Sequence, residues 1–199
     1  MGRPKDANPE QTRVTILDAA EDEFAEHGFD GTRMVAIATR AGVTHGLLHY
    51  YFDSKDGLYE QVVGRLFRRH LRLFEQLGAD GTVILARDLV LKSFDLFWEH
   101  PNQVRIMLWE MASGDDRVET AMKDFYDGMA RALAALPARA ASGEAGKDPR
   151  DVYVSILGAL VVYFFRDPAI KRLFGENRFT EADRKRRRAH LSALLDSML

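Results

Sequence analysis

The sequence contains no cysteine. A disulfide framework and a zinc site built on thiolates are therefore excluded, which favours a protein of the reducing cytoplasm. Long hydrophobic runs are also missing, since no segment approaches the roughly 20 apolar residues of a transmembrane helix. The N-terminal stretch MGRPKDANPEQTR lacks an apolar core, so it does not look like a secretory signal peptide. We therefore expect a cytoplasmic protein.

An excess of positive charge is absent as well. The chain carries 28 Lys and Arg against 30 Asp and Glu, for a formal net charge of −2. Such a balance counts against a globally basic DNA-binding protein. If the N-terminal segment binds DNA, its cluster of carboxylates must face away from the phosphates. That cluster consists of Asp18, Glu21, Asp22, Glu23 and Glu26.

Apolar residues recur at helical spacing along the chain, and no strand pattern is present. With 46% hydrophobic residues, the 199-residue chain can bury a sizeable core. The sequence therefore predicts an all-α fold of about nine helices, with Thr32 and Ser54 as the caps of the second and the fourth. The helices are expected at residues 10–27, 32–41, 44–50, 55–77, 82–100, 102–112, 118–136, 149–166 and 181–199.

The segment of residues 32–55 predicts two short helices around a tight turn. Gly42 stands where a helix that ends in the left-handed conformation needs glycine, and Thr44 is a good N-cap for the next helix. This arrangement is typical of a helix-turn-helix unit, whose second helix lies in the major groove of DNA. The apolar face of the first helix consists of Met34, Ile37, Ala38 and Ala41.

The second helix of this unit carries side chains suited to reading DNA. A rotation of about 100° per residue, with the apolar face in the core, places Gly46 and Tyr50 outermost. His45 and His49 lie on one flank and can hydrogen-bond bases or phosphates, while Leu47 can contact a thymine methyl group. The two histidines also have the i, i+4 spacing of a metal pair. In a reading helix we interpret them as DNA contacts, and we expect no metal.

The string A-G-V-T-x-G-x-L-x-x-Y-F-x-S-K, from Ala41 to Lys55, resembles the DNA-binding signature of the TetR family of bacterial transcriptional regulators. The turn at residues 28–32 also fits the family, whereas His49 stands where the family usually has tyrosine. The resemblance covers roughly the first quarter of the chain. It implies a three-helix DNA-binding domain at residues 1–58, joined through a long fourth helix to a ligand-binding and dimerisation domain at residues 59–199.

The resemblance also implies which residues contact DNA. Free N–H groups at helix N-termini bind anions, so Thr32 and Arg33 at one helix start and Lys55 at another are expected to hold phosphates, with Tyr51 between them. The remaining contacts are expected from the recognition helix: Thr44, His45, Gly46, Leu47, His49 and Tyr50.

The C-terminal half is rich in aromatic residues and methionine, a composition that also suits a plain core. Because TetR-family proteins bind small inducers between helices of this half, the resemblance favours a mostly apolar ligand pocket. Asp95 and Glu110 are weaker polar candidates beside it, and no cofactor is expected. The expected lining consists of Phe67, Phe94, Trp98, Met107, Trp109, Met111, Phe125, Met129 and Tyr153.

The helix expected at residues 149–166 contains VYVSILGALVVYFF, which is apolar all round and therefore buried on more than one side. In the TetR family, this helix and the last one pair with their copies in a second protomer. The resemblance therefore implies a homodimer through Val152–Phe165 and Leu191–Met198. Its two recognition helices, about 34–36 Å apart, would read a pseudo-palindromic operator. Burial within a single protomer is the alternative.

The combined interpretation is a homodimeric repressor that an apolar small molecule releases from its operator. An activator, or a regulator that responds to a protein partner, is an open alternative on the same fold. A helical enzyme working in the C-terminal cavity is a further alternative, although no nucleophile motif or phosphate-binding loop supports it. The basic run Arg184–Arg188 resembles a nucleic-acid patch, but its place in an amphipathic helix favours a solvated helix face.

Overall fold

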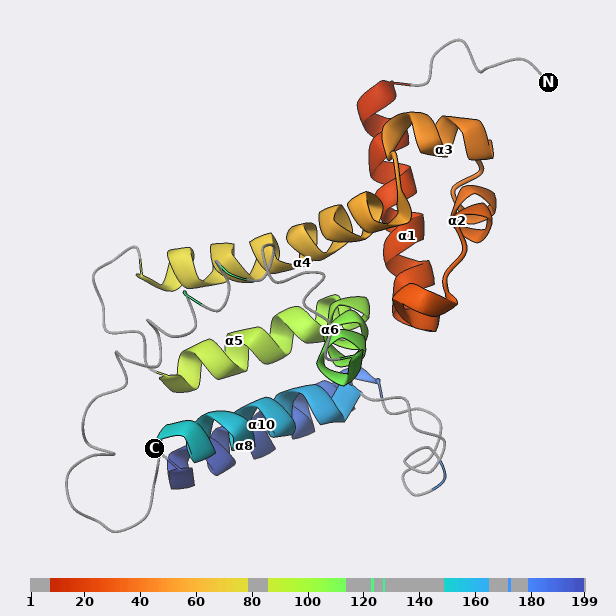
Figure 1. The fold of residues 1–199 in the computed structure, drawn as a ribbon. Coiled ribbons are helices and arrows are strands. Elements are labelled where there is room, and N and C mark those ends of the chain that lie inside the picture. Colours follow the sequence, from red (N-terminus) through yellow and green to blue (C-terminus); the bar gives the residue numbers. More distant parts are fainter. Residues whose placement is uncertain are drawn as a thin grey trace. The chain divides into compact units, whose positions relative to one another are not determined.

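The fold is known from a computed structural model, which describes residues 8–78, 86–113, 123, 127, 149–164, 172 and 179–198. All regular structure in these residues is helical, which confirms the all-α prediction (Figure 1). The helix expected at residues 118–136 lies almost wholly outside them. Within the described ranges, no helix combines the length and the apolar character needed to span a bilayer.

The chain forms two compact units, which we call the N-terminal unit (residues 1–68 and 105–122) and the C-terminal unit (residues 69–104 and 123–199). Two helices, α4 (Lys55–Gly78) and α6 (Pro101–Ser113), contribute residues to both units. The boundary placed at residue 58 from the sequence stays a prediction.

In the N-terminal unit, α1 (Pro9–Gly31), α2 (Met34–Arg40) and α3 (His45–Tyr51) pack together, with α2 against both α1 and α3 (Figure 1). In α1, the apolar residues Ile16, Ala19, Ala20 and Phe24 are all buried. Fully burying a large apolar side chain contributes about 1.5–3 kcal/mol each, so these residues hold the unit together. Its largest fully buried side chains include Ile16, Phe24, Ile37, Leu48, Leu58 and Tyr59.

The end of α1 departs from the prediction at Thr32. Gly28 interrupts the helix with φ 68° and ψ −179°, which leaves carbonyl groups at the helix end in need of donors. The Thr32 hydroxyl donates to two of them, Glu23 O at 3.1 Å and Gly28 O at 2.7 Å. The N-cap of α2 is instead Arg33, whose side chain makes no capping bond. The prediction that Thr32 caps the second helix is therefore wrong.

In the C-terminal unit, α5 (Ala86–Glu99) packs against α8 (Pro149–Val161) and α10 (Glu181–Met198). A 3-10 turn, η2 (Val162–Phe164), continues α8. The centre of this unit is aromatic and aliphatic, with Phe94, Phe164 and Leu191 each no more than 2% exposed. The helix predicted at residues 149–166 is thus α-helical as far as Val161 and continues as a 3-10 turn over residues 162–164.

A buried polar network crosses the C-terminal unit. Neutral His70 on α4 lies between Ser93 on α5, 3.2 Å from its Nε2, and Gln103 on α6, 3.0 Å from its Nδ1. Burial lowers the pKa of His70 to about 4, because desolvation penalises the charged imidazolium. The network therefore supplies hydrogen bonds without introducing a charge into the core.

The basic run at the start of α10 holds that helix in place. Arg184 donates to Asp95 at 2.9 Å and approaches Glu99 at 3.5 Å, and Arg188 donates to Asp95 at 3.1 Å. Both carboxylates belong to α5, so these ion pairs join α10 to α5. Arg184 and Arg188 thus serve packing within the unit.

Candidate nucleic-acid interface

The turn between α2 and α3 has the geometry that the sequence predicted. Ala41 is the C-cap of α2, and Gly42 follows in the left-handed region with φ 67°. The Thr44 hydroxyl accepts a hydrogen bond from the Leu47 N–H at 3.2 Å and so caps α3. Leu48 is 0% exposed and anchors α3 in the core. These contacts fix which side of α3 faces outward.

The outward side of α3 is polar and aromatic. Tyr50 is 79% exposed, and His45, Gly46 and His49 are exposed as well. The two histidine rings contact each other edge to face, with centroids 4.5 Å apart. A Cβ atom at Gly46 would meet nothing within 4 Å, so the backbone is open on that side. Leu47 is half-buried beside them.

The predicted phosphate contacts occupy different environments. Arg33 is exposed at the start of α2, and Tyr51 is half-buried next to Tyr50. At the start of α4, the Lys55 ammonium lies 4.3 Å from the centroid of the Phe29 ring. Thr32 is only 2% exposed, and its hydroxyl is used inside the unit. Of these four residues only Arg33 is exposed, and the assignment of the four to phosphate contacts stays a prediction.

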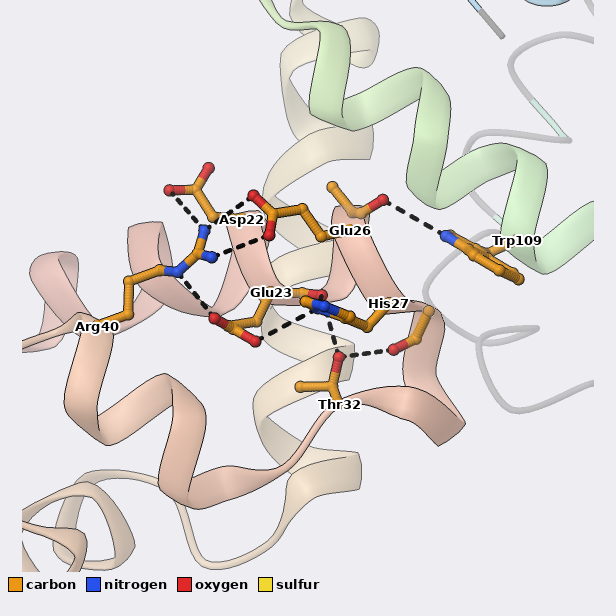
Figure 2. A network of polar contacts seen from close by, with 9 residues as sticks. Asp22, Glu23, Glu26, His27, Thr32, Arg40 and Trp109 are labelled. Atoms are coloured by element: carbon orange, nitrogen blue, oxygen red, sulfur yellow. Dashed lines mark hydrogen bonds and ion pairs between the residues drawn. The ribbon is translucent and has the colours of Figure 1, made fainter. Parts of the chain in front are cut away.

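Three carboxylates of the acidic cluster bind one arginine (Figure 2). The Arg40 guanidinium at the end of α2 lies 2.8 Å from Glu23, 3.0 Å from Glu26 and 3.6 Å from Asp22. The hydrogen bond from Arg40 is the largest cause that lowers the pKa of Glu26, and it raises the pKa of Arg40 in turn. These three ion pairs join α1 to the C-terminal end of α2, which precedes the turn.

The other two carboxylates of the cluster bind Arg65 on α4. Its guanidinium lies 2.6 Å from Asp18 and 2.5 Å from Glu21. All five carboxylates of the acidic cluster are therefore paired with arginines of the same unit. The acidic composition of the segment serves the packing of its helices, and the charge near the reading helix is largely compensated.

Trp109 on α6 contacts α1 at the break. Its indole N–H donates to Ala25 O at 3.4 Å, and its ring carbons lie 3.0–3.3 Å from where a Cβ of Gly28 would stand (Figure 2). On the same helix, Glu110 accepts a hydrogen bond from the Tyr59 hydroxyl on α4. Trp109 was predicted to line a pocket and Glu110 was the weaker polar candidate beside it. In the structure, the two residues attach α6 to α1 and α4.

Replacing Gly28 is expected to test the Trp109 contact. Gly28→Ala should lower the free energy of unfolding by roughly 2 kcal/mol or more, because its backbone conformation is nearly restricted to glycine and the new methyl group meets the indole. Gly42→Ala is the matched control, since it also has positive φ but open space around it. Urea unfolding of both variants, each with and without Trp109→Ala, gives the coupling energy.

In that cycle, Trp109→Ala should recover part of the Gly28→Ala loss and none of the Gly42→Ala loss. If the losses of free energy of unfolding from Trp109→Ala and from each glycine substitution simply add at both positions, Trp109 does not restrain the break in α1.

The other residues predicted to line a ligand pocket are spread over the two units. Phe94 and Trp98 belong to the C-terminal unit, where their ring centroids are 5.8 Å apart. Phe67 and Met107 are buried in the N-terminal unit, whereas Met111 there is 57% exposed. The assignment of these residues to a pocket stays a prediction. Phe125, Met129 and the side chain of Tyr153 lie outside what the structure describes.

Sequence reasoning missed Arg40 and Arg65, the two arginines that pair with the acidic cluster of α1. Each pairs with residues at least 14 positions away in the chain, and no local pattern marks such a pairing. Among the described residues, no group of three or more His, Asp or Glu side chains is placed to hold a metal ion.

Comparison with known families matches most of the chain. Residues 16–62 match the family described as "Bacterial regulatory proteins, tetR family", and residues 85–194 match "Tetracyclin repressor-like, C-terminal domain". The second match alone spans more than half of the chain. Together the two matches confirm the resemblance that the helix-turn-helix string indicated.

Curated relatives are regulators of transcription. RutR of Escherichia coli K12, an HTH-type transcriptional regulator, is 33% identical over 103 residues, which cover 51% of this chain and 49% of RutR. NicS of Pseudomonas putida KT2440, an HTH-type transcriptional repressor, is 33% identical over 107 residues, with the same coverage of 51% and 49%. The chain thus spans about half the length of the curated relatives it matches.

Solved structures share the fold over nearly the whole chain. The ketosteroid transcriptional regulator KstR2 of Mycobacterium tuberculosis superimposes with a TM-score of 0.73 at 19% identity, covering 94% of each chain. The regulator SCO4942 of Streptomyces coelicolor gives a TM-score of 0.68 at 24% identity, covering 94% of this chain and 97% of that one. The chain therefore belongs to the tetR family of bacterial regulatory proteins.

Proposed function

We propose that this regulator is a cytoplasmic homodimeric repressor, which binds a pseudo-palindromic operator and is released by a small, mostly apolar molecule. The observation that carries the proposal is the outer face of α3, where Tyr50, His45 and His49 are exposed while Leu48 anchors the helix. Polar rings on a rigid short helix suit the readout of base edges. The repressor named among the relatives supports the direction of regulation.

The role of each DNA contact follows from its exposure. His45, His49 and Tyr50 would read bases, and Gly46 would let the α3 backbone approach the duplex closely. Arg33 would bind a phosphate and set the register of the protein on DNA without reading sequence. Thr44 and Leu47 would flank these contacts, and Tyr51 and Lys55 would add support from the edge of the unit.

Dimerisation is supported by an exposed apolar stripe that runs along α8 to the first residue of η2. Val154 and Val162 are 64% and 54% exposed, and Gly158 lies midway between them, also exposed. These positions are i, i+4 and i+8, so they share one face of the helix. A Cβ at Gly158 would meet nothing within 4 Å in the protomer. A second copy packed on this stripe would cover the valines, and the glycine would allow close approach of the helices.

Gly158→Glu is therefore expected to convert the dimer to a monomer while each protomer stays folded. A carboxylate at this position would meet its own copy across the two-fold axis, where like charges repel. Size-exclusion chromatography with light scattering measures the oligomeric state, and circular dichroism checks the helix content. Lys92→Glu on α5 is the control, because it places a carboxylate on an exposed position of another helix. A dimeric Gly158→Glu protein would rule out this interface.

We propose α6 as the route by which a ligand acts on the DNA-binding helix. This helix contributes residues to both units, and its Trp109 and Glu110 contact α1 and α4. A ligand that favours one position of α6 would shift the population of DNA-binding conformers by its difference in affinity for the two states. Trp109 is therefore proposed as a transmitting residue in place of a pocket-lining one.

Footprinting on the DNA upstream of the gene tests the proposed mode of binding. A C2 dimer should protect two half-sites separated by about 10 base pairs, centre to centre, on one face of the duplex. Protection of one isolated half-site by a dimer would contradict the pseudo-palindromic mode.

A further inference from the structure

Arg187 on α10 differs from its arginine neighbours because none of the described carboxylates pairs with it. Arg184 and Arg188 pair with Asp95, and Arg186 pairs with Asp183. Among the described residues, no carboxylate lies within ion-pair distance of Arg187, although its side chain is half-buried. Burial is the largest influence on its pKa, which is lowered. A cation removed from water without a counter-ion is unfavourable, and an anionic ligand would relieve that cost.

The guanidinium of Arg187 is only partly used. One Nη2–H donates to Ala159 O near the end of α8, at 2.6 Å. The Nε atom is buried and has no hydrogen-bond partner in the described structure. The hydrogen bond to the end of α8 uses one of the five N–H groups of the guanidinium fork, and the negative end of the helix dipole strengthens it. This bond leaves the buried Nε–H without an acceptor, and a ligand carboxylate inserted beside it would supply one.

One aromatic ring lies against this cation, and two further rings lie beside that ring. The Arg187 guanidinium carbon lies 4.9 Å from the centroid of the Tyr163 ring. Tyr163 is nearly parallel to Trp98, at an interplanar angle of 27°, and the Phe179 centroid is 5.5 Å from that of Trp98. Phe179 is 40% exposed, and Trp98 and Tyr163 are half-buried, so solvent reaches these rings. We call Trp98, Tyr163 and Phe179 the aromatic trio.

We propose that Arg187 and the aromatic trio form a binding site for an apolar carboxylic acid. The carboxylate pairs with the Nε–H of the guanidinium, and a flat apolar body stacks on the aromatic rings. The regulatory role of this site rests on the ligand response proposed above. The site specifies the chemical class of that ligand, because it makes the inducer an organic anion and not a neutral apolar molecule. All its residues lie in the C-terminal unit, between α5, η2 and α10.

A matched pair of probes tests the charge requirement on the full-length protein. 2-Naphthoate and 2-naphthamide have the same ring system, and only the first has a carboxylate. Isothermal titration should show that naphthoate binds at least about tenfold more tightly than naphthamide. Arg187→Gln should remove this preference by weakening naphthoate alone, and Arg187→Lys should keep part of it, because a charge remains without the fork.

Arg186→Gln is the control variant, since Arg186 already pairs with Asp183 and is well exposed. It should bind both probes like the wild type. The melting temperature of each variant without probe shows whether the variant is folded. If Arg187→Gln does not fold, Arg187→Lys still tests the proposal. No binding of naphthoate at millimolar concentration, equal binding of the two probes, or a preference that survives Arg187→Gln would overturn the site and leave Arg187 as a cap of α8.

A second readout separates this site from the proposed repressor function. Fluorescence anisotropy of labelled upstream DNA is measured with and without naphthoate. Naphthoate that binds through Arg187 and releases the DNA supports both proposals. Naphthoate that binds through Arg187 and leaves the DNA bound upholds the anion site while counting against its role as the inducer site.

Discussion

Tyr50→Ala is expected to weaken binding to the specific operator by about 1–3 kcal/mol, or roughly 5- to 150-fold, while binding to random DNA changes little. Tyr50 is 79% exposed at the outer side of α3, so the fold does not depend on its packing. The loss should therefore fall on base readout, and preference should relax at one base position in each half-site. Anisotropy titrations against operator and random DNA measure both effects.

Arg33→Gln is the matched variant for the phosphate contacts. Because a phosphate contact is independent of sequence, it should weaken binding to both DNAs by a similar factor. Removing one released counterion per protomer should also reduce the slope of log K against log salt by about one per protomer. Thermal unfolding of both variants should match the wild type. If the two variants behave alike on the two DNAs, the division between reading and clamping residues is wrong.

His70 should make the C-terminal unit sensitive to acid. The folded pKa is about 4, whereas an unfolded histidine titrates near 6.5. Above pH 6.5 both states are neutral and His70 adds no pH dependence. As the pH falls from 6.5 to 4, only the unfolded state takes up the proton, so unfolding becomes more favourable. The full shift corresponds to a loss of about 3 kcal/mol in the free energy of unfolding.

The contribution of His70 can be isolated by comparison with His70→Gln. Glutamine retains hydrogen-bonding groups toward Ser93 and Gln103 but does not titrate. Urea unfolding is measured from pH 7 to pH 4 for both proteins. The wild type should lose more stability across that window than the variant, and the difference should be largest near pH 4. Parallel stability curves would mean that His70 is not desolvated in the folded protein.

Local patterns predicted the helices and the turn because the required information lies within a few residues. The i, i+3, i+4 spacing places Ile37 and Ala38 in the core, and both are at most 3% exposed. Gly42 has positive φ, and Thr44 caps α3, as their residue types indicate. A short exposed helix with a single anchoring leucine follows directly from this pattern.

Contacts between distant segments were not visible in the sequence. Thr32 satisfies the sequence rule for an N-cap, but the carbonyls freed by the break at Gly28 lie closer and take its hydroxyl. Trp109 fits the composition predicted for a ligand pocket, and its indole also packs on α1. The three carboxylate partners of Arg40 belong to another helix, so no local pattern marks them. For these residues, the type of side chain allows several partners, and only the tertiary structure shows which of them are contacted.

We expect α3 to read a specific operator as part of a dimer. Binding of the purified protein to DNA from upstream of its own gene, at two salt concentrations and with random DNA of equal length alongside, tests it most directly. We predict tight, sequence-selective binding at the lower salt, and a selectivity for the upstream DNA that persists at the higher salt while both affinities fall. Equal and weak binding to the two DNAs would contradict the claim.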